Sequence, residues 1–288
     1  MIHNSSVIDQ KAKISKNVKI GPFCYVGPNV ELAENVELVS NVHIEGDSLI
    51  GSNTKIFPFA SIGTQPQDLK YKGENNSLEI GDYNVIREYV TINPRTSGGG
   101  SKTIIGNNCL FMISSHVAHD CVIGNNVVIA NNVPLGGHVT IEDSVVIGGN
   151  SAVQQFTRIG KMAMIGGMSG VSRDVIPYGL SFGNRNYLEG INSIGLRRKK
   201  VSNKEILVLS EAYKEIFTTH TLADGRVVNP LRNIGLKRMF GFASTVFGVP
   251  YGTVEAFKAI HDVTDEEMSA LRRFVPDWSK NSTLVPIR

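Results

Sequence analysis

The side chains in this chain that could exchange protons are concentrated in one stretch. His116, His119 and Asp120 lie within five residues of one another, and His138 and Gln155 follow at intervals close to 18 residues. An imidazole gains or loses a proton near neutral pH, so histidines gathered at one place are candidates for acid–base chemistry. These residues form one cluster only if the chain returns to the same place about every 18 residues.

The chain should return at that interval, because its apolar residues recur with a period of six. Every sixth residue from Ile105 to Val171 is apolar, and the same period runs from Ile2 to Ile62. This is the hexapeptide pattern of a left-handed parallel β-helix. Each hexad supplies one short strand whose apolar residue points inward, and three hexads complete one triangular coil. Residues 18 apart should therefore lie on successive coils, about 4.8 Å from each other.

The repeat predicts one polar band on the surface of the β-helix. His119, His138 and Gln155 should share a face, with His116 at the preceding corner. Polar residues on such a face are often only solvated, which is the simplest alternative. The three histidines could also bind zinc, but their spacings of 3 and 19 residues do not resemble the ligand pattern of β-helical carbonic anhydrases. We therefore predict no metal site.

The β-helix should extend over residues 1–190, with two interruptions. The polar, turn-rich stretch 63–79 and the glycine-containing stretch 93–104 are expected to be loops that project from a corner. Loops on a rigid scaffold are common places for binding residues. Residues 178–190 show no regular pattern, so we expect irregular structure there.

Beyond residue 190 the apolar residues recur at helical spacing instead. Ser202 with Glu205, and Thr264 with Glu267, form capping boxes that mark helix starts. Residues 191–288 are therefore predicted to be a small helical domain. We expect it to cover the open end of the β-helix, whose last strands would otherwise leave backbone groups unpaired.

Composition narrows the class of protein. The 288 residues carry a net charge of +3 with the positive excess after residue 190, which suits an acidic partner or a phosphorylated small molecule. No basic stripe interleaved with aromatic residues indicates nucleic-acid binding. There is no run of 18 apolar residues and no signal-peptide pattern at the start, so we expect a cytoplasmic protein without stable membrane insertion. The three cysteines should be buried spacers of the hexads.

Six motifs go further than the hexads. They are Gln67-Asp68-Leu69-Lys70-Tyr71, His116-Val117-Ala118-His119-Asp120-Cys121, Gly136-Gly137-His138-Val139, Gln155-Phe156, Gly166-Gly167 and Gly195-Leu196-Arg197-Arg198. Together they resemble the UDP-N-acetylglucosamine acyltransferases that begin lipid A synthesis. The resemblance covers roughly residues 1–217 in order and spacing.

The resemblance implies roles for particular residues. His119 looks like the general base, Asp120 like its supporting acid, and Gly137 like the residue whose backbone N–H stabilises an oxyanion. The residues implied to bind the substrates are Gln67, Asp68, Lys70, His116, His138, Gln155, Asn192, Arg198 and Lys199. Gly167 matches the position that measures the length of the acyl chain.

The resemblance also implies a reaction and an assembly. The expected enzyme is a homotrimer that transfers a 3-hydroxyacyl chain from acyl carrier protein to the 3-hydroxyl of UDP-N-acetylglucosamine. No cofactor is expected, because the chain arrives on the phosphopantetheine of the carrier. Acyl-chain length and the choice between a hydroxyl and an amine acceptor stay open. The alternatives are a related N-acyltransferase or acetyl-CoA enzyme, and a non-catalytic β-helix, for which a flat repeated threonine ladder would be typical.

Overall fold

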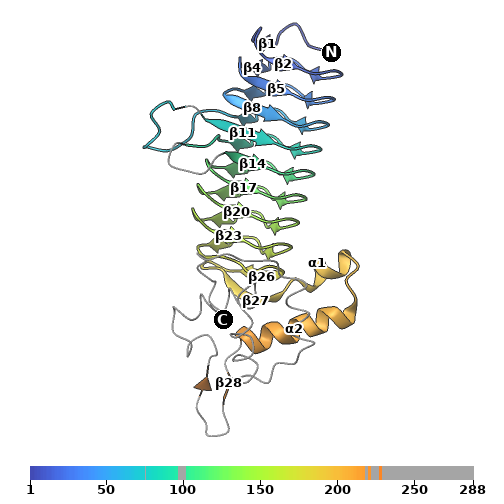
Figure 1. Cartoon of the computed structure of the whole chain (residues 1–288), viewed down its shortest axis with the longest axis vertical. Coiled ribbons are helices and arrows are strands. Elements are labelled where there is room, and N and C mark those ends of the chain that lie inside the picture. The colour runs from blue at the N-terminus through green and yellow to red at the C-terminus, as the bar shows by residue number, and fades with distance from the viewer. Residues whose placement is uncertain (75, 97–101, 218–219, 222–226, 229–288) are drawn as a thin grey trace, which may run out of the picture.

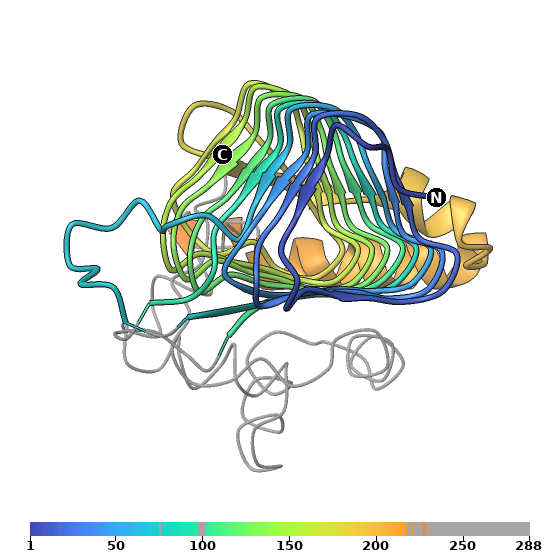
Figure 2. The ribbon, with the colours of Figure 1, turned by 90° about the horizontal axis from the view of Figure 1, so that it is seen from above.

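The chain winds into a parallel β-helix capped by helices at its C-terminal end. The structure, a computed structural model, describes residues 1–74, 76–96, 102–217, 220–221 and 227–228. The coils stack along the long axis of the molecule (Figure 1), and the end-on view shows that each coil is triangular (Figure 2). The left-handed parallel β-helix predicted from the hexads is therefore confirmed.

Three sheets form the sides of the prism, and each coil adds one strand to each sheet. Sheet A contains β3 (Lys19–Ile20), β6 (Glu37–Leu38), β9 (Lys55–Ile56), β12 (Val85–Ile86), β15 (Leu110–Phe111), β18 (Val128–Ile129), β21 (Val146–Ile147), β24 (Met164–Ile165), β26 (Gly179–Phe182) and β27 (Tyr187–Ile191). Sheet B contains β1 (Val7–Ile8), β4 (Tyr25–Val26), β7 (His43–Ile44), β10 (Ser61–Ile62), β13 (Thr91–Ile92), β16 (His116–Val117), β19 (Pro134–Leu135), β22 (Ala152–Val153) and β25 (Gly170–Val171). Sheet C contains β2 (Lys13–Ile14), β5 (Val30–Leu32), β8 (Asp47–Ile50), β11 (Ser77–Ile80), β14 (Thr103–Ile105), β17 (Val122–Ile123), β20 (Thr140–Ile141) and β23 (Arg158–Ile159).

The core is a set of columns built from the inward residues of the hexads. In sheet B, Ile62, Ile92 and Val117 lie in register on successive coils, and all three are completely buried. Leu135 and Val153 continue this column. Burying one such side chain contributes roughly 1.5–3 kcal/mol, so the repeated column stabilises every coil in the same way. The uninterrupted column holds the outward residues at fixed places.

The corners of the prism turn through a residue in the left-handed backbone conformation. Between sheets C and A this residue is commonly asparagine, as at Asn17, Asn35 and Asn53, with φ of 58° to 61°. Asparagine tolerates this conformation because its short side chain bonds locally. Between sheets B and C the same position is taken by Asp120 and His138. Side chains capable of chemistry thus occupy turn positions at this corner where asparagine would suffice for folding.

Both predicted loops leave the corner between sheets B and C. The first runs from residue 63 to β11 and the second from residue 93 to β14, so each ends two or three residues earlier than the hexads indicated. Figure 2 shows the first loop projecting from this corner. The loops therefore lie on the same edge of the prism as Asp120 and His138.

The C-terminal end differs in part from the prediction. Where irregular structure was expected, β26 and β27 form an antiparallel hairpin that continues sheet A. Helices α1 (Ser193–Arg198) and α2 (Asn203–Phe217) follow, and the capping box of Ser202 and Glu205 is confirmed by its hydrogen bonds. Two short strands, β28 (His220–Thr221) and β29 (Val227–Val228), pair farther along. The second predicted capping box lies outside the described residues.

Helix α2 closes the end of the β-helix. It packs against β27, its Leu209 is completely buried, and the Tyr213 hydroxyl donates a 2.6 Å hydrogen bond to the carbonyl oxygen of Pro177. Figure 1 shows α2 lying across the last coils. This matches the cover expected for the open edge of a solenoid. Within the described part of the chain, no helix has the length and apolar character needed to cross a membrane.

Candidate active site

The proton-handling residues form two neighbouring columns at the corner between sheets B and C. His119, Gly137 and Gln155 are 18 residues apart, and so are Asp120, His138 and Phe156. The hexad spacing predicted His119 and His138 in the same band and His116 at a corner. The structure instead puts His116 on strand β16 and His119 at the corner that follows it. His119 and His138 thus occupy neighbouring positions of the corner and not equivalent ones, so their side chains point in different directions.

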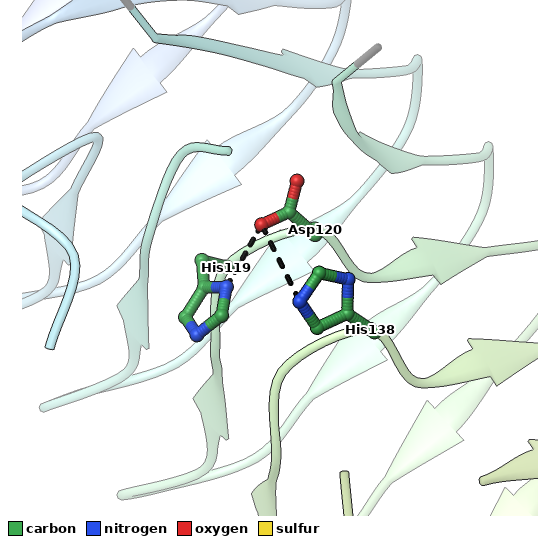
Figure 3. A group of neighbouring side chains, drawn as sticks. All are labelled: His119, Asp120 and His138. Carbon is green, nitrogen blue, oxygen red and sulfur yellow. Dashed lines mark hydrogen bonds and ion pairs between the residues drawn. The ribbon is translucent and has the colours of Figure 1, made fainter. Parts of the chain in front are cut away.

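His119 and Asp120 form a hydrogen-bonded pair. The distance from Nδ1 of His119 to Oδ2 of Asp120 is 2.8 Å, as Figure 3 shows. The His119 side chain is 14% exposed and that of Asp120 is completely buried. A carboxylate accepts rather than donates, so this bond places the imidazole proton on Nδ1. Nε2 then carries the lone pair, and no described residue hydrogen-bonds it.

Asp120 is held by Thr96 of the second loop and by Thr103 at the start of β14. The backbone N–H of Thr96 and its hydroxyl both donate to Oδ2 of Asp120, at 3.1 and 2.9 Å. The backbone N–H of Asp120 donates to the hydroxyl oxygen of Thr103, at 2.8 Å. A buried carboxylate needs such donors, because it has no water to bond. The carboxylate is therefore oriented by Thr96, which lies outside its own hexad, whereas Thr103 holds the backbone of Asp120.

His138 lies on the other side of the same carboxylate. Its Nε2 is 4.0 Å from Oδ2 of Asp120, and its ring meets that of His119 edge-on with the ring centroids 5.1 Å apart. Phe156 stacks on the other face of the His138 ring, with the centroids 4.6 Å apart and the planes within 9°. Phe156 is 63% exposed, so it presents an apolar surface that a ligand could contact. Gln155 beside it is also exposed.

Gly137 lies directly against the His119 ring. A Cβ atom built on Gly137 would come within 2.6 Å of Cε1 and 2.7 Å of Nε2 of His119. Only glycine leaves room for the imidazole in this position. The carbonyl oxygen of Gly137 accepts from the N–H of Phe156, whereas its own N–H donates to no acceptor in the part of the chain that the structure describes. A free backbone donor therefore lies beside the basic nitrogen of His119.

His116 is neutral in this environment. The hydroxyl of Thr91 is 2.7 Å from its Nδ1. Burial lowers the pKa of His116, and the nearby His119 lowers it further. His116 therefore presents an uncharged ring on sheet B next to the corner that carries His119.

The three groups His119, Asp120 and His138 have ligand atoms within 4.8 Å of one another, a separation at which a metal ion could be held. The shared oxygen of Asp120, however, already accepts from Thr96 and His119. A zinc ligand must turn a lone pair toward the metal. The hydrogen bonding thus fits a base and its orienting acid better than a metal cage, and the absence of a metal site stays a prediction.

The other predicted site residues lie at all three corners of the prism. Gln67, Asp68 and Lys70 belong to the first loop, at the corner of His119, where the Lys70 N–H donates to Asp68. Gly167 lies between β24 and β25, at the corner between sheets A and B. Asn192, at the start of α1, donates to the carbonyl of Met162 at the corner between sheets C and A, and Arg198 and Lys199 follow at the other end of α1.

A single copy of the chain therefore does not bring these groups together. Figure 2 shows the first loop and helix α1 on opposite sides of the prism. A site that contained both His119 and Arg198 would need a second copy of the chain. Leu69, at the tip of the first loop, is fully exposed.

Two residues of this site had no assigned role in the sequence analysis. Phe156 could have been found, because it lies 18 residues after His138 in the same column. Thr96 could not, because it belongs to a loop that has no hexad register. The cysteines behave as predicted, since Cys24, Cys109 and Cys121 are buried. Burial raises the pKa of Cys109 to about 11 and that of Cys121 to about 12, so both thiols stay protonated.

Comparison with known proteins decides the family. A model described as bacterial transferase hexapeptide (six repeats) matches residues 11–46 and 102–137, and one described as UDP N-acetylglucosamine O-acyltransferase, domain 2, matches 174–241. A Helicobacter acinonychis (strain Sheeba) protein named acyl-(acyl-carrier-protein)–UDP-N-acetylglucosamine O-acyltransferase is 56% identical over 216 residues, which are 75% of this chain and 80% of the relative. The chain belongs to the UDP-N-acetylglucosamine O-acyltransferase family. The resemblance seen in the motifs is confirmed.

Other members of this acyltransferase family support the assignment. The Paracoccus denitrificans (strain Pd 1222) relative of the same name is 51% identical over 161 residues, so the match spans 56% of this chain and 62% of that relative's length. The solved UDP-N-acetylglucosamine acyltransferase of Bacteroides fragilis 9343 has a TM-score of 0.78 at 35% identity and covers 100% of both chains. The family model of the second domain continues to residue 241, past the end of the resemblance seen in the motifs.

Proposed function

We propose that this chain transfers a 3-hydroxyacyl group from acyl carrier protein to the 3-hydroxyl of UDP-N-acetylglucosamine, with His119 as the general base. The donor and the acceptor are those in the relatives' names, and the 3-hydroxyacyl group is what the resemblance of the motifs implies. One observation carries the role of His119: its Nδ1 is bonded to a buried carboxylate while Nε2 lies against the backbone of Gly137. A base and a hydrogen-bond donor side by side are what acyl transfer to a hydroxyl needs.

The chemistry follows from this arrangement. Nε2 of His119 removes the proton from the sugar hydroxyl as its oxygen attacks the thioester carbonyl. The negative charge of Asp120 stabilises the imidazolium that forms. The N–H of Gly137 donates to the oxyanion of the tetrahedral intermediate. When the intermediate collapses, the imidazolium returns its proton to the leaving thiolate of the carrier, so no cofactor is retained and no acyl-enzyme forms.

The purified protein can test the reaction directly. It should acylate UDP-N-acetylglucosamine when it is given a graded series of 3-hydroxyacyl carrier proteins. A matched acceptor with an amine at carbon 3 separates an O-acyltransferase from an N-acyltransferase, and acetyl-CoA serves as the control donor. Transfer only to the amine, or only from acetyl-CoA, would contradict the proposal. The non-catalytic alternative is disfavoured, because the outward residues of sheet B beside the site are Thr91, His116 and Pro134, not a threonine ladder.

We propose further that the active site is shared between subunits of a homotrimer. His119 and Arg198 lie at different corners of one copy, so they meet only across a subunit contact. Co-expression of His119→Ala and Arg198→Ala chains should then restore activity that neither variant has alone. In a closed trimer of randomly mixed chains, roughly a quarter of the sites would combine both intact residues. No recovery in the mixed trimers would place both residues in one subunit.

Gly167→Met is expected to shift the preferred donor to a chain several carbons shorter. The Cβ of the new side chain would lie 3.2 Å from the carbonyl oxygen and 3.8 Å from the nitrogen of Gly149, so a shift of a few tenths of an ångström in that backbone should accommodate it. Each methylene group of the acyl chain that can no longer be buried weakens donor binding by about 0.8 kcal/mol. Competition between donors of graded length measures the change, and the shortest donor is the internal control. An unchanged length profile would place the ruler elsewhere.

The enzyme should dock its carrier protein through its basic C-terminal part and work in the cytoplasm. The positive excess after residue 190 suits docking of an acidic carrier protein. The clustered basic residues at the end of α1, Arg197 and Arg198, are exposed and available for such a contact. A cytoplasmic location fits a reaction that draws on a carrier protein and a sugar nucleotide.

A further inference from the structure

Thr96 makes two hydrogen bonds to the His119–Asp120 pair, and the proposed reaction gives this residue no role. It is 4% exposed and belongs to the loop between β13 and β14, one coil before the corner that it touches. Its backbone N–H and its hydroxyl both reach Oδ2 of Asp120, the oxygen that also accepts from Nδ1 of His119. One buried atom is thus the meeting point of three donors.

The other oxygen of the Asp120 carboxylate shows why the hydrogen bonds to Oδ2 fix the direction of this group. Oδ1 of Asp120 is buried and has no hydrogen-bond partner among the described residues. The direction of the carboxylate therefore depends on the donors at Oδ2 alone. Without the Thr96 hydroxyl, the carboxylate could rotate to exchange its two oxygens or lean toward His138, whose Nε2 is 4.0 Å away. Either movement would weaken the bond to Nδ1 of His119.

We infer that Thr96 is a positioning residue, whose hydroxyl holds the Asp120 carboxylate so that His119 keeps its proton on Nδ1 and its lone pair on Nε2. This inference rests on the proposed role of His119 as the general base. The residue does not touch the reacting atoms. It acts through Asp120, and it ties the second loop to the catalytic corner.

The test compares three variants of the full-length protein. Thr96→Val removes the hydroxyl and keeps the shape, so kcat should fall about tenfold with KM nearly unchanged; the loss is limited because the backbone N–H of residue 96 still donates. Thr96→Ser restores the donor and should recover most of the loss. Thr103→Val is the matched control, because it removes a threonine hydroxyl that accepts from the backbone N–H of Asp120 and, among the described residues, makes no hydrogen bond to the carboxylate. It is expected to lower the melting temperature more than kcat.

A spectroscopic readout separates positioning from general damage. The chain has seven histidines, so ¹⁵N imidazole spectra of selectively labelled protein can show the His119 tautomer, assigned by its loss in His119→Gln. Wild type and Thr103→Val should both show a single Nδ1–H tautomer, and Thr96→Val a mixture of tautomers. Thr96→Ala, which also lacks the hydroxyl, replaces the Val variant if valine prevents folding.

The outcomes distinguish the two proposals. An unchanged His119 tautomer and unchanged kcat in Thr96→Val would overturn the positioning role while leaving His119 as the base. Equal changes in Thr96→Val and Thr103→Val would also overturn it, because the effect would then be disruption of the corner. An Nε2–H tautomer in the wild-type protein would instead contradict the proposed function, since His119 would have no lone pair where the substrate binds.

Discussion

Replacing His119 by alanine should lower kcat for acyl transfer by about 10²–10⁴ while the protein stays folded. The expected loss is large because the imidazole combines a completely buried orienting carboxylate with a free basic nitrogen beside Gly137. The fold should tolerate the change, because the His119 side chain lies at a corner and outside the core columns. Steady-state turnover and the melting temperature of the variant measure the two effects.

His116 offers a matched control for this experiment. It is also a histidine next to the site, but its Nδ1 is bonded to the Thr91 hydroxyl rather than to a carboxylate. His116→Ala should therefore affect KM more than kcat. If His119→Ala retained more than roughly a tenth of wild-type turnover, another group would have to be the base.

Gly137→Ala is the second substitution with a large expected effect, a loss of about 10² in kcat. The backbone N–H of residue 137 survives this change, so the oxyanion donor is retained. The added methyl group, however, would overlap the His119 ring, with Cε1 at 2.6 Å and Nε2 at 2.7 Å from the new Cβ. The imidazole must move to relieve this overlap. A displacement of about 1 Å at a catalytic group is enough to cost two orders of magnitude in rate.

A control glycine and a double variant test whether Gly137→Ala acts through the His119 ring. Gly149→Ala places a methyl group 3.4 Å from the carbonyl oxygen of Asn131 at another corner, which is an ordinary contact, so kcat should change little. The double variant His119→Ala, Gly137→Ala should be no slower than His119→Ala alone, because the displaced ring is then absent. Full activity in Gly137→Ala, or additive losses in the double variant, would show that the glycine does not act through the ring.

The architecture was readable from the sequence because it depends on local repetition. An inward apolar residue every six positions is buried by the next coil, and the same residue type recurs wherever the coil repeats. The pairing of His119 with Asp120 was implied by the resemblance of the motif to the acyltransferase family, not by the spacing. The capping box of Ser202 and Glu205 was found because it is a pattern of four consecutive residues.

Which groups complete the site depends on how the whole chain folds. Thr96 belongs to a loop without hexad register, so no spacing indicates that it reaches Asp120 across the chain. The position of Arg198 away from the corner of His119 follows from the β26–β27 hairpin, which reverses the chain before α1 and has no hexad register. The six-residue period of apolar residues indicates how each residue packs within the stacked coils. Contacts made by loops and chain reversals depend on where the whole chain passes in space, and no local pattern records that.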